Sequence, residues 1–144
     1  MRRALLDSDI WSEIARDRSP TVSANARAYI RQHGRYTVSV VTVMEAVRGY
    51  SRIGREDKIK LLLKLFARAE VLLLDQTAAE LAGRVRADLE RIGRNMDLPD
   101  LLVATIALRN AVPVVTGNFA HFDKVRDAGY PLVIESWRAP VTEG

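Results

Sequence analysis

The fold class is decided by residues 97–116, which read DLPDLLVATIALRNAVPVVT. The first part predicts a helix over 97–110, because Asp97 suits the N-cap position and Pro99 suits the first turn. The second part, 112–116, is a short apolar run that predicts a buried strand. A helix that leads directly into a buried strand is typical of an α/β fold with a parallel sheet.

The same alternation extends outward from this stretch in both directions. Further helices are predicted over 8–16, 20–33, 42–52, 56–67, 77–94 and 119–127. The predicted strands are 3–6, 36–41, 71–74, 112–116 and 132–134. No linker, repeat or low-complexity tract interrupts the pattern, so we expect a single α/β domain over 1–144, with about five mostly parallel strands covered on both faces.

The composition limits the chemistry that the chain can perform. It has 144 residues, with 22 Lys and Arg against 18 Asp and Glu, no Cys and two His. Without Cys there is no thiolate nucleophile, disulfide or Cys-based metal site. Any metal site must use oxygen ligands, which favours Mg²⁺ or Mn²⁺. The net charge of +4 suggests an anionic partner such as nucleic acid.

The sequence does not predict a membrane protein. No segment approaches the roughly 20 apolar residues that span a bilayer. The first residues briefly resemble a signal peptide, but Asp7 and Asp9 interrupt the apolar run, so it cannot act as one. We therefore expect a cytoplasmic protein with no membrane partner.

Acidic and polar side chains gather at the ends of the predicted strands, where sites form in open parallel sheets. They are Asp7 and Asp9 after the first strand, Thr42 and Glu45 after the second, Thr116, Asn118 and Asp123 after the fourth, and Asp97 and Asp100 at the start of the helix before it. Carboxylates that converge raise one another's pKa unless a cation neutralises them. A divalent cation at this edge would suit phosphodiester hydrolysis.

Each acid also has a structural explanation. Asp7 and Asp97 fit helix N-caps, and Asp100 fits the first helical turn, where the helix dipole favours negative charge. Thr42 and Glu45 have the spacing of a capping box. Any one of these acids is therefore weak support for a site, and the support comes from their common position at one edge.

Four segments resemble, in order, the motifs of PIN-domain ribonucleases. They read LLDSDI at 5–10, SVVTVMEAVRG at 39–49, DLLVAT at 100–105 and VVTGNFAHF at 114–122. The resemblance covers nearly the whole chain and is closest to the VapC toxins of bacterial and archaeal toxin–antitoxin modules. It implies a three-layer α/β/α PIN-like domain and a Mg²⁺- or Mn²⁺-dependent endoribonuclease that acts as a toxin.

Carried over by position, the resemblance makes Asp7, Glu45 and Asp100 the catalytic metal ligands. Asn118 stands where many relatives carry an acid, so it would bind the metal or a water without adding charge. Asp97 would complete or support the metal shell. The metal would activate a water for in-line attack on the phosphate.

Other side chains are assigned around this site. Asp9 is expected to support the metal ligands, and the hydroxyl of Thr116 to bond a ligand carboxylate or an RNA phosphate. Arg48 and Arg52 begin a basic run with few acids. This run is a better candidate for RNA phosphate contact than the arginines of residues 84–94, which alternate with acids. Trp11 and His121 are favoured as packing or surface residues over base stacking and base catalysis.

The resemblance also implies protein partners. A cognate VapB-type antitoxin would lay its C-terminal segment in an apolar groove near Trp11, Leu61 and Leu65, with a basic side chain reaching the acids. The apolar face of helix 56–67 is wider than one core needs, and a homodimer would cover it.

Two other functions stay open. The sequence Asp7-Ser8-Asp9 after a strand also begins aspartate-nucleophile phosphatases of the haloacid-dehalogenase type, although Trp11 stands where they carry Thr or Val. Asn118, which lacks the expected charge, leaves open a catalytically inactive PIN-fold binding module.

Overall fold

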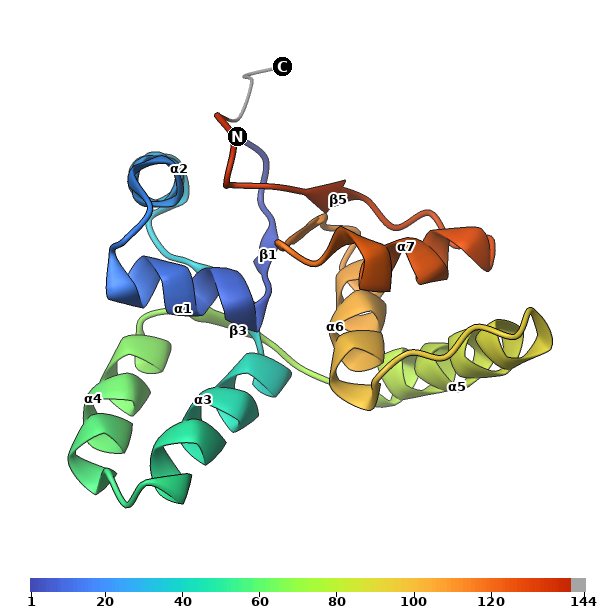
Figure 1. Cartoon of the computed structure of the whole chain (residues 1–144), viewed down its shortest axis with the longest axis horizontal. Helices are drawn as coiled ribbons and strands as arrows, with labels where there is room; N and C mark the ends of the chain where they lie inside the picture. Colours follow the sequence, from blue (N-terminus) through green and yellow to red (C-terminus); the bar gives the residue numbers. More distant parts are fainter. Residues whose placement is uncertain (141–144) are drawn as a thin grey trace.

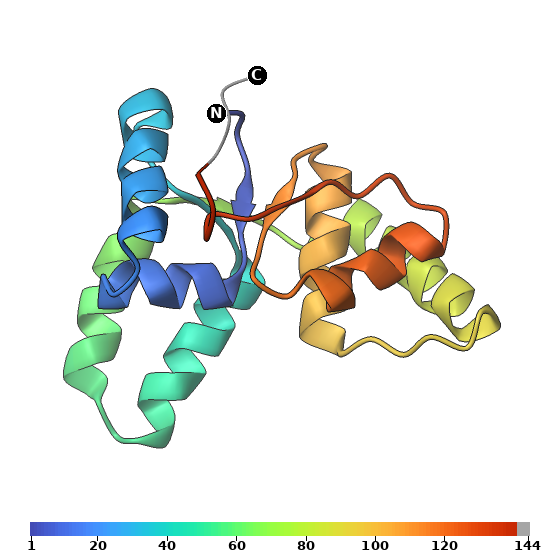
Figure 2. The same cartoon turned by 45° about the horizontal axis from the view of Figure 1, so that its top comes forward.

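A computed structural model describes residues 1–140, so the last four residues of the expected domain lie outside the described part. Short strands run through the middle of the molecule (Figure 1). Helices α1 to α4 lie on one side of them, and α5 to α7 lie on the other (Figure 2). This is the expected α/β arrangement with helices on both faces.

The elements alternate along the chain as predicted. The helices are α1 Ser8–Arg16, α2 Pro20–His33, α3 Val40–Arg52, α4 Glu56–Ala67, α5 Gln76–Arg91, α6 Leu98–Arg109 and α7 Phe119–Asp127. The strands are β1 Leu5–Leu6, β2 Thr37–Ser39, β3 Glu70–Leu72, β4 Val114–Val115 and β5 Ile134–Glu135. Each strand has only two or three residues, so the predicted strand lengths were too long.

Every recorded strand pairing is parallel. In the first sheet β4 lies between β1 and β5, with Leu5 opposite Val114 and Val114 opposite Ile134. In the second, β2 pairs with β3, with Val38 opposite Val71. The predicted count of five parallel strands is confirmed, although they form two hydrogen-bonded groups.

The start of α3 differs from the prediction for a local reason. The side chain of Ser39 accepts hydrogen bonds from Val41 N at 3.2 Å and Thr42 N at 3.4 Å. This cap begins the helix at Val40 and ends β2 at Ser39, so the predicted strand over 36–41 was too long. The predicted capping box of Thr42 and Glu45 was wrong, because Ser39, and not Thr42, is the N-cap residue of α3.

The caps of other helices follow the sequence signals. Ser19 accepts from Val22 N at 3.3 Å, and Gly34 ends α2 at a φ of +80°. Asp75 accepts from Ala78 N at 2.8 Å, which starts α5 one residue earlier than predicted. The helix also ends at Arg91, two residues before Gly93 adopts a φ of +67°. That glycine explains why α5 stops short of the predicted residue 94.

Two groups of buried apolar residues fix the layers. One includes Leu101, Ile106 and Phe122 and holds α6 and α7 together, and the other includes Tyr29 and Trp137 and packs under α1 and α2. With these elements held in place, the carboxyl ends of β1 and β4 meet at one edge. Within residues 1–140, no helix has both the length and the apolar character needed to cross a lipid bilayer.

Candidate active site

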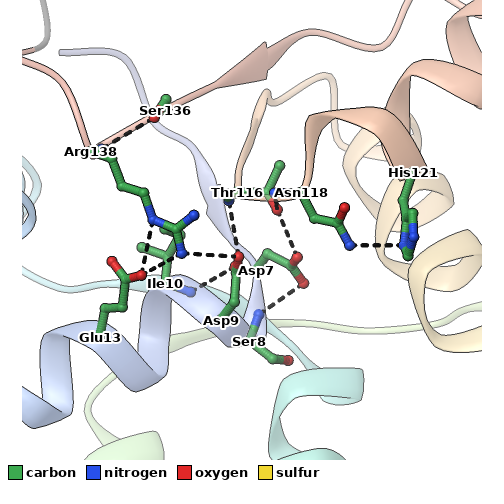
Figure 3. A network of polar contacts seen from close by, with 11 residues as sticks. Asp7, Ser8, Asp9, Ile10, Glu13, Thr116, Asn118, His121, Ser136 and Arg138 are labelled. Atoms are coloured by element: carbon green, nitrogen blue, oxygen red, sulfur yellow. Dashed lines mark hydrogen bonds and ion pairs between the residues drawn. The ribbon is translucent and has the colours of Figure 1, made fainter.

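Asp7 lies at the centre of this edge, where β1 ends and α1 begins. Its side chain is 6% exposed. Oδ1 accepts a 2.8 Å hydrogen bond from Ser8 N, and Oδ2 accepts a 2.9 Å hydrogen bond from the hydroxyl of Thr116 (Figure 3). Since Thr116 directly follows β4, the parallel pairing of β1 with β4 brings these two side chains together.

The carboxyl group of Asp7 has an unusual protonation equilibrium. Burial raises its pKa from 3.8 to about 7, and the negative charges of Asp9 and, to a smaller degree, Asp100 add to this rise. The hydrogen bonds from Ser8 and Thr116 lower the pKa without offsetting the burial. Asp7 is thus a buried acid that faces other acids, which is the electrostatic situation that a divalent cation relieves.

Glu45 reaches the same edge from α3. Its Oε1 accepts a 2.7 Å hydrogen bond from the hydroxyl of Ser8, which lies 3.0 Å from Thr42 Oγ1. Ser8 therefore contacts Asp7 through its backbone and Glu45 through its side chain. Sequence reasoning assigned no separate role to Ser8, although a serine directly after the first acid was an available signal.

Asp100, Asn118 and His121 form a third part of the edge. His121 Nδ1 lies 2.9 Å from Asp100 Oδ2 and donates to it when this nitrogen carries the proton, because a carboxylate only accepts. Asn118 Nδ2 lies 2.8 Å from the same ring nitrogen (Figure 3). The prediction of a merely packing or surface His121 missed this contact, since only the fold brings α7 against the start of α6.

The remaining predicted acids differ in their surroundings. Asp97 is the N-cap residue of α6, but its exposed side chain makes no capping hydrogen bond. It lines a pocket of about 460 Å³ together with His121. Asp123 forms an ion pair with Arg126 over 3.2 Å. Asp97 thus remains available to a ligand, whereas Asp123 already has a cationic partner.

Asp9 connects α1 to the loop after β4. Its Oδ2 accepts a 3.0 Å hydrogen bond from Gly117 N and lies 3.8 Å from Nη2 of Arg138 (Figure 3). Arg138 also donates from Nε to Glu13 Oε1 over 2.9 Å. Sequence reasoning missed Glu13 and Arg138, because neither belongs to a motif and 125 residues separate them.

The predicted nucleic-acid contacts fall in two different places. Arg48 and Arg52 are exposed on α3, three and seven residues after Glu45, and so lie on its side of the helix. Thr116 is fully buried, and its hydroxyl is bonded to Asp7 and to the backbone N–H of Asn118. Thr116 therefore acts on Asp7, and direct contact with RNA does not fit its burial.

Trp11 is a packing residue, as favoured from the sequence. It is 9% exposed, stacks on Phe66 with ring centroids 5.0 Å apart, and meets Tyr36 edge-on at 5.9 Å. Trp11 is also among the residues that line an apolar groove of about 450 Å³. Base stacking on Trp11 is excluded by these contacts.

The donor set suits a hard divalent cation in its chemistry. It offers carboxylates from three elements, one of them buried with a raised pKa, and the amide oxygen of Asn118. Within residues 1–140, however, no three His, Asp or Glu side chains lie close enough together to hold an ion. Glu45 is bonded to Ser8 and Asp100 to His121 through one carboxylate oxygen each, so the second oxygen of each would be the one to approach a cation shared with Asp7.

Comparison with known proteins agrees with this fold and edge. The family model described as the PIN domain matches residues 4–128. The chain belongs to the PIN domain family. It is 30% identical over 104 residues to the tRNA(fMet)-specific endonuclease VapC of Salmonella typhimurium, which covers 72% of this chain and 76% of that protein. Within the family it is of the VapC type.

Two further comparisons support the same grouping. Ribonuclease VapC1 of Methanocaldococcus jannaschii is 25% identical over 121 residues, which cover 84% of this chain and 87% of that protein. A DNA-bound VapBC structure from Salmonella typhimurium superposes with a TM-score of 0.77 at 25% identity, covering 95% of this chain and 99% of that one. The sequence prediction of a VapC-type PIN domain is therefore confirmed.

Proposed function

We propose that this protein is a metal-dependent endoribonuclease that hydrolyses RNA phosphodiester bonds as the toxin of a VapBC-type pair. The observation that carries the proposal is Asp7, a buried carboxyl with a pKa near 7 that faces the charges of Asp9 and Asp100. Such a group destabilises the metal-free protein when it ionises, and a bound cation would relieve this cost, which supports the proposal. The relatives named as VapC ribonucleases add support.

The cation would be Mg²⁺ or Mn²⁺, held by Asp7, Glu45 and Asp100, with Asn118 and Asp97 completing or supporting the shell. When bound, it supplies Lewis acidity, lowering the pKa of a water and neutralising charge on the phosphate. Neutral Asn118 limits the negative charge of the shell.

The chain's own residues orient these ligands. Thr116 and the backbone N–H of Ser8 hold the two oxygens of Asp7 in one orientation. The hydroxyl of Ser8 holds Glu45, and His121 holds Asp100. These bonds fix the direction of each carboxylate before substrate arrives, and such pre-organisation is a large part of catalytic efficiency.

Arg48 and Arg52 are the proposed RNA contacts on α3. They continue the side of the helix that begins with Glu45, about one and two turns further on, and both are exposed. A phosphate backbone that lies along this face would meet the acids at one end and the arginines at the other.

An antitoxin of the VapB type would occupy the apolar groove that Trp11, Ile14, Tyr36 and Leu65 line. Trp11 lies one turn after Asp7 on α1, so a peptide in the groove could extend a basic side chain toward the acids. Relatives of known structure include VapBC complexes. Leu61 and Leu63 on α4 are 56% and 48% exposed, and we propose a homodimer that covers this helix.

The test is cleavage of structured RNA by protein purified free of antitoxin. With Mg²⁺ or Mn²⁺ we expect cleavage that EDTA abolishes and that Asp7→Ala and Asp100→Ala each reduce by more than a hundredfold. Glu80→Ala, an exposed acid on α5 paired with Arg84, is the matched control and should keep full activity. Cleavage that survives both site substitutions would refute the site assignment.

The rival functions give other outcomes in the same assay. Hydrolysis of small phosphate esters without RNA cleavage would favour the phosphatase, although PIN-domain membership and the buried Trp11 argue against it. RNA binding with no hydrolysis under any metal would identify an inactive binding module.

A further inference from the structure

We infer that Arg138 binds a phosphate of the RNA substrate at the edge of the acidic site, beside Asp9 and the loop that contains Gly117. The inference rests on the proposed ribonuclease function and adds a substrate-binding residue to it. Arg138 follows β5 by three residues, so it reaches the site from the opposite end of the chain to Asp7.

The backbone on both sides of Arg138 is held in place. Trp137 is 1% exposed and belongs to the core that includes Tyr29. Asn25 Nδ2 donates to the carbonyl oxygens of Trp137 and Ala139, each over 3.0 Å. Ser136 Oγ accepts the N–H of Arg138 over 3.2 Å. The start of this side chain is thus fixed relative to the core.

The guanidinium group lies directly against Gly117. A Cβ atom on this glycine would overlap Nη1 and Cζ of Arg138, so this close approach requires glycine. Gly117 lies between Thr116, which donates to Asp7, and Asn118. The positive charge is therefore packed on the same loop that orients the central carboxyl (Figure 3).

Arg138 retains hydrogen-bonding capacity toward solvent. A guanidinium has five N–H donors in a planar fork that suits phosphate oxygens. Among residues 1–140, the side-chain hydrogen bonds of Arg138 use Nε and Nη2, both toward Glu13, and Nη1 makes none. The side chain is 47% exposed. A phosphate at the site edge could accept from Nη1 while the pair with Glu13 holds the fork in place.

The competing explanation is that Arg138 and Glu13 form an ion pair with a structural role only. Substituting each partner separately distinguishes this explanation from RNA binding. Arg138→Ala removes the cation, and Glu13→Gln removes the same pair but leaves the cation. Arg138→Lys keeps the charge and loses the fork. Gly117→Ala displaces the guanidinium without removing its charge, and its thermal unfolding should match that of the native protein.

The measurement is fluorescence anisotropy of a labelled RNA in EDTA, where no cleavage occurs, at several salt concentrations. We expect Arg138→Ala to weaken binding about tenfold and to reduce the salt slope by about one. Gly117→Ala and Arg138→Lys should weaken it less, and Glu13→Gln should bind at least as well as the native protein. In cleavage assays with Mn²⁺, the KM values of the variants should rise in the same order as their loss of RNA binding.

Equal losses in Arg138→Ala and Glu13→Gln would show a structural pair and overturn the inference. Unchanged or tighter binding in Arg138→Ala would overturn it as well, as would faster cleavage, which would show that Arg138 obstructs the site. Failure of the proposed function looks different, because the native protein would then cleave no RNA with either metal.

Discussion

The hydroxyl of Ser8 donates a 2.7 Å hydrogen bond to Oε1 of Glu45, and so joins the first turn of α1 to α3. The backbone N–H of the same residue donates to Asp7. A single serine thereby sets the directions of two carboxylates that come from different strand ends. Because Glu45 bonds Ser8 and Ser39 caps α3, Glu45 has no capping role and is available to a ligand.

Ser8→Ala should weaken metal binding and cleavage without unfolding the protein. The variant loses the hydrogen bond to the Glu45 carboxylate, worth about 1.5 to 3 kcal/mol for a charged acceptor, and keeps the backbone bond to Asp7. We expect about a tenfold loss in Mn²⁺ affinity, measured by calorimetry. Ser12→Ala, on the same helix, is the control. Equal affinities for the two variants would contradict the role of Ser8.

The metal-free protein should become less stable as pH rises from about 4 to about 7. The folded-state pKa of Asp7 is raised from 3.8 to about 7, so the folded protein holds its proton where the unfolded chain has released it. That advantage is complete below pH 4 and is lost by the time pH passes 7. Thermal unfolding in EDTA across this range measures the effect.

Asp7→Asn should be more stable than the native protein at pH 8 in EDTA, because it removes a buried charge. Mg²⁺ or Mn²⁺ should reduce this difference in stability, because the cation stabilises only the native protein. Glu80→Gln, exposed on α5, is the control and should leave the pH dependence unchanged. A native protein as stable as Asp7→Asn at pH 8 without metal would refute the raised pKa.

Thr116→Val should reduce both stability and cleavage. The substitution preserves shape but removes the donor to Asp7 and leaves the backbone N–H of Asn118 without its acceptor. A buried group that loses its partner costs about 1 to 3 kcal/mol. Thr105→Val is the matched control: that hydroxyl is equally buried but bonds only a carbonyl of its own helix.

Urea unfolding and RNA cleavage separate the two parts of this effect. Thr105→Val should lose some stability and keep its activity, whereas Thr116→Val should lose activity more than tenfold under conditions where it is folded. Full activity in folded Thr116→Val would show that Asp7 needs no orienting bond.

Leu65→Lys should release the toxin from its antitoxin and leave cleavage intact. Leu65 is 54% exposed and lines the groove beside Trp11, so a charge there disfavours an apolar peptide but not the fold. Ile92→Lys, at the C-cap of α5, has 48% exposure and lies outside the groove lining, and it is the control. Pull-down with the cognate antitoxin should fail for Leu65→Lys alone, and retention by both variants would place the antitoxin elsewhere.

The sequence predicted what local signals determine. Ser19 and Gly34 are strong start and stop signals for α2, and the bounds of α1, α2, α4 and α7 match the predictions. The neighbouring positions of Asp7 and Thr116 followed from the rule that parallel strands end at one edge. The predicted strand lengths were wrong because N-cap residues such as Ser39 begin a helix where the strand was expected to continue.

Contacts between distant segments were beyond such signals. His121 meets Asp100 only because α7 packs against the start of α6, and Arg138 meets Glu13 only because Trp137 is buried. Neither contact has a spacing or composition that marks it. Both contacts depend on how side chains pack once the layers of the fold have assembled.

The pairing of β1 with β4 has a consequence for synthesis of the protein. Thr116, the partner of Asp7, is made 109 residues after it. A growing chain therefore carries the acids without the site, and contacts so distant in sequence form slowly. We expect chains that end at Asn110 to be inert, because they lack Thr116 and its hydrogen bond to Asp7.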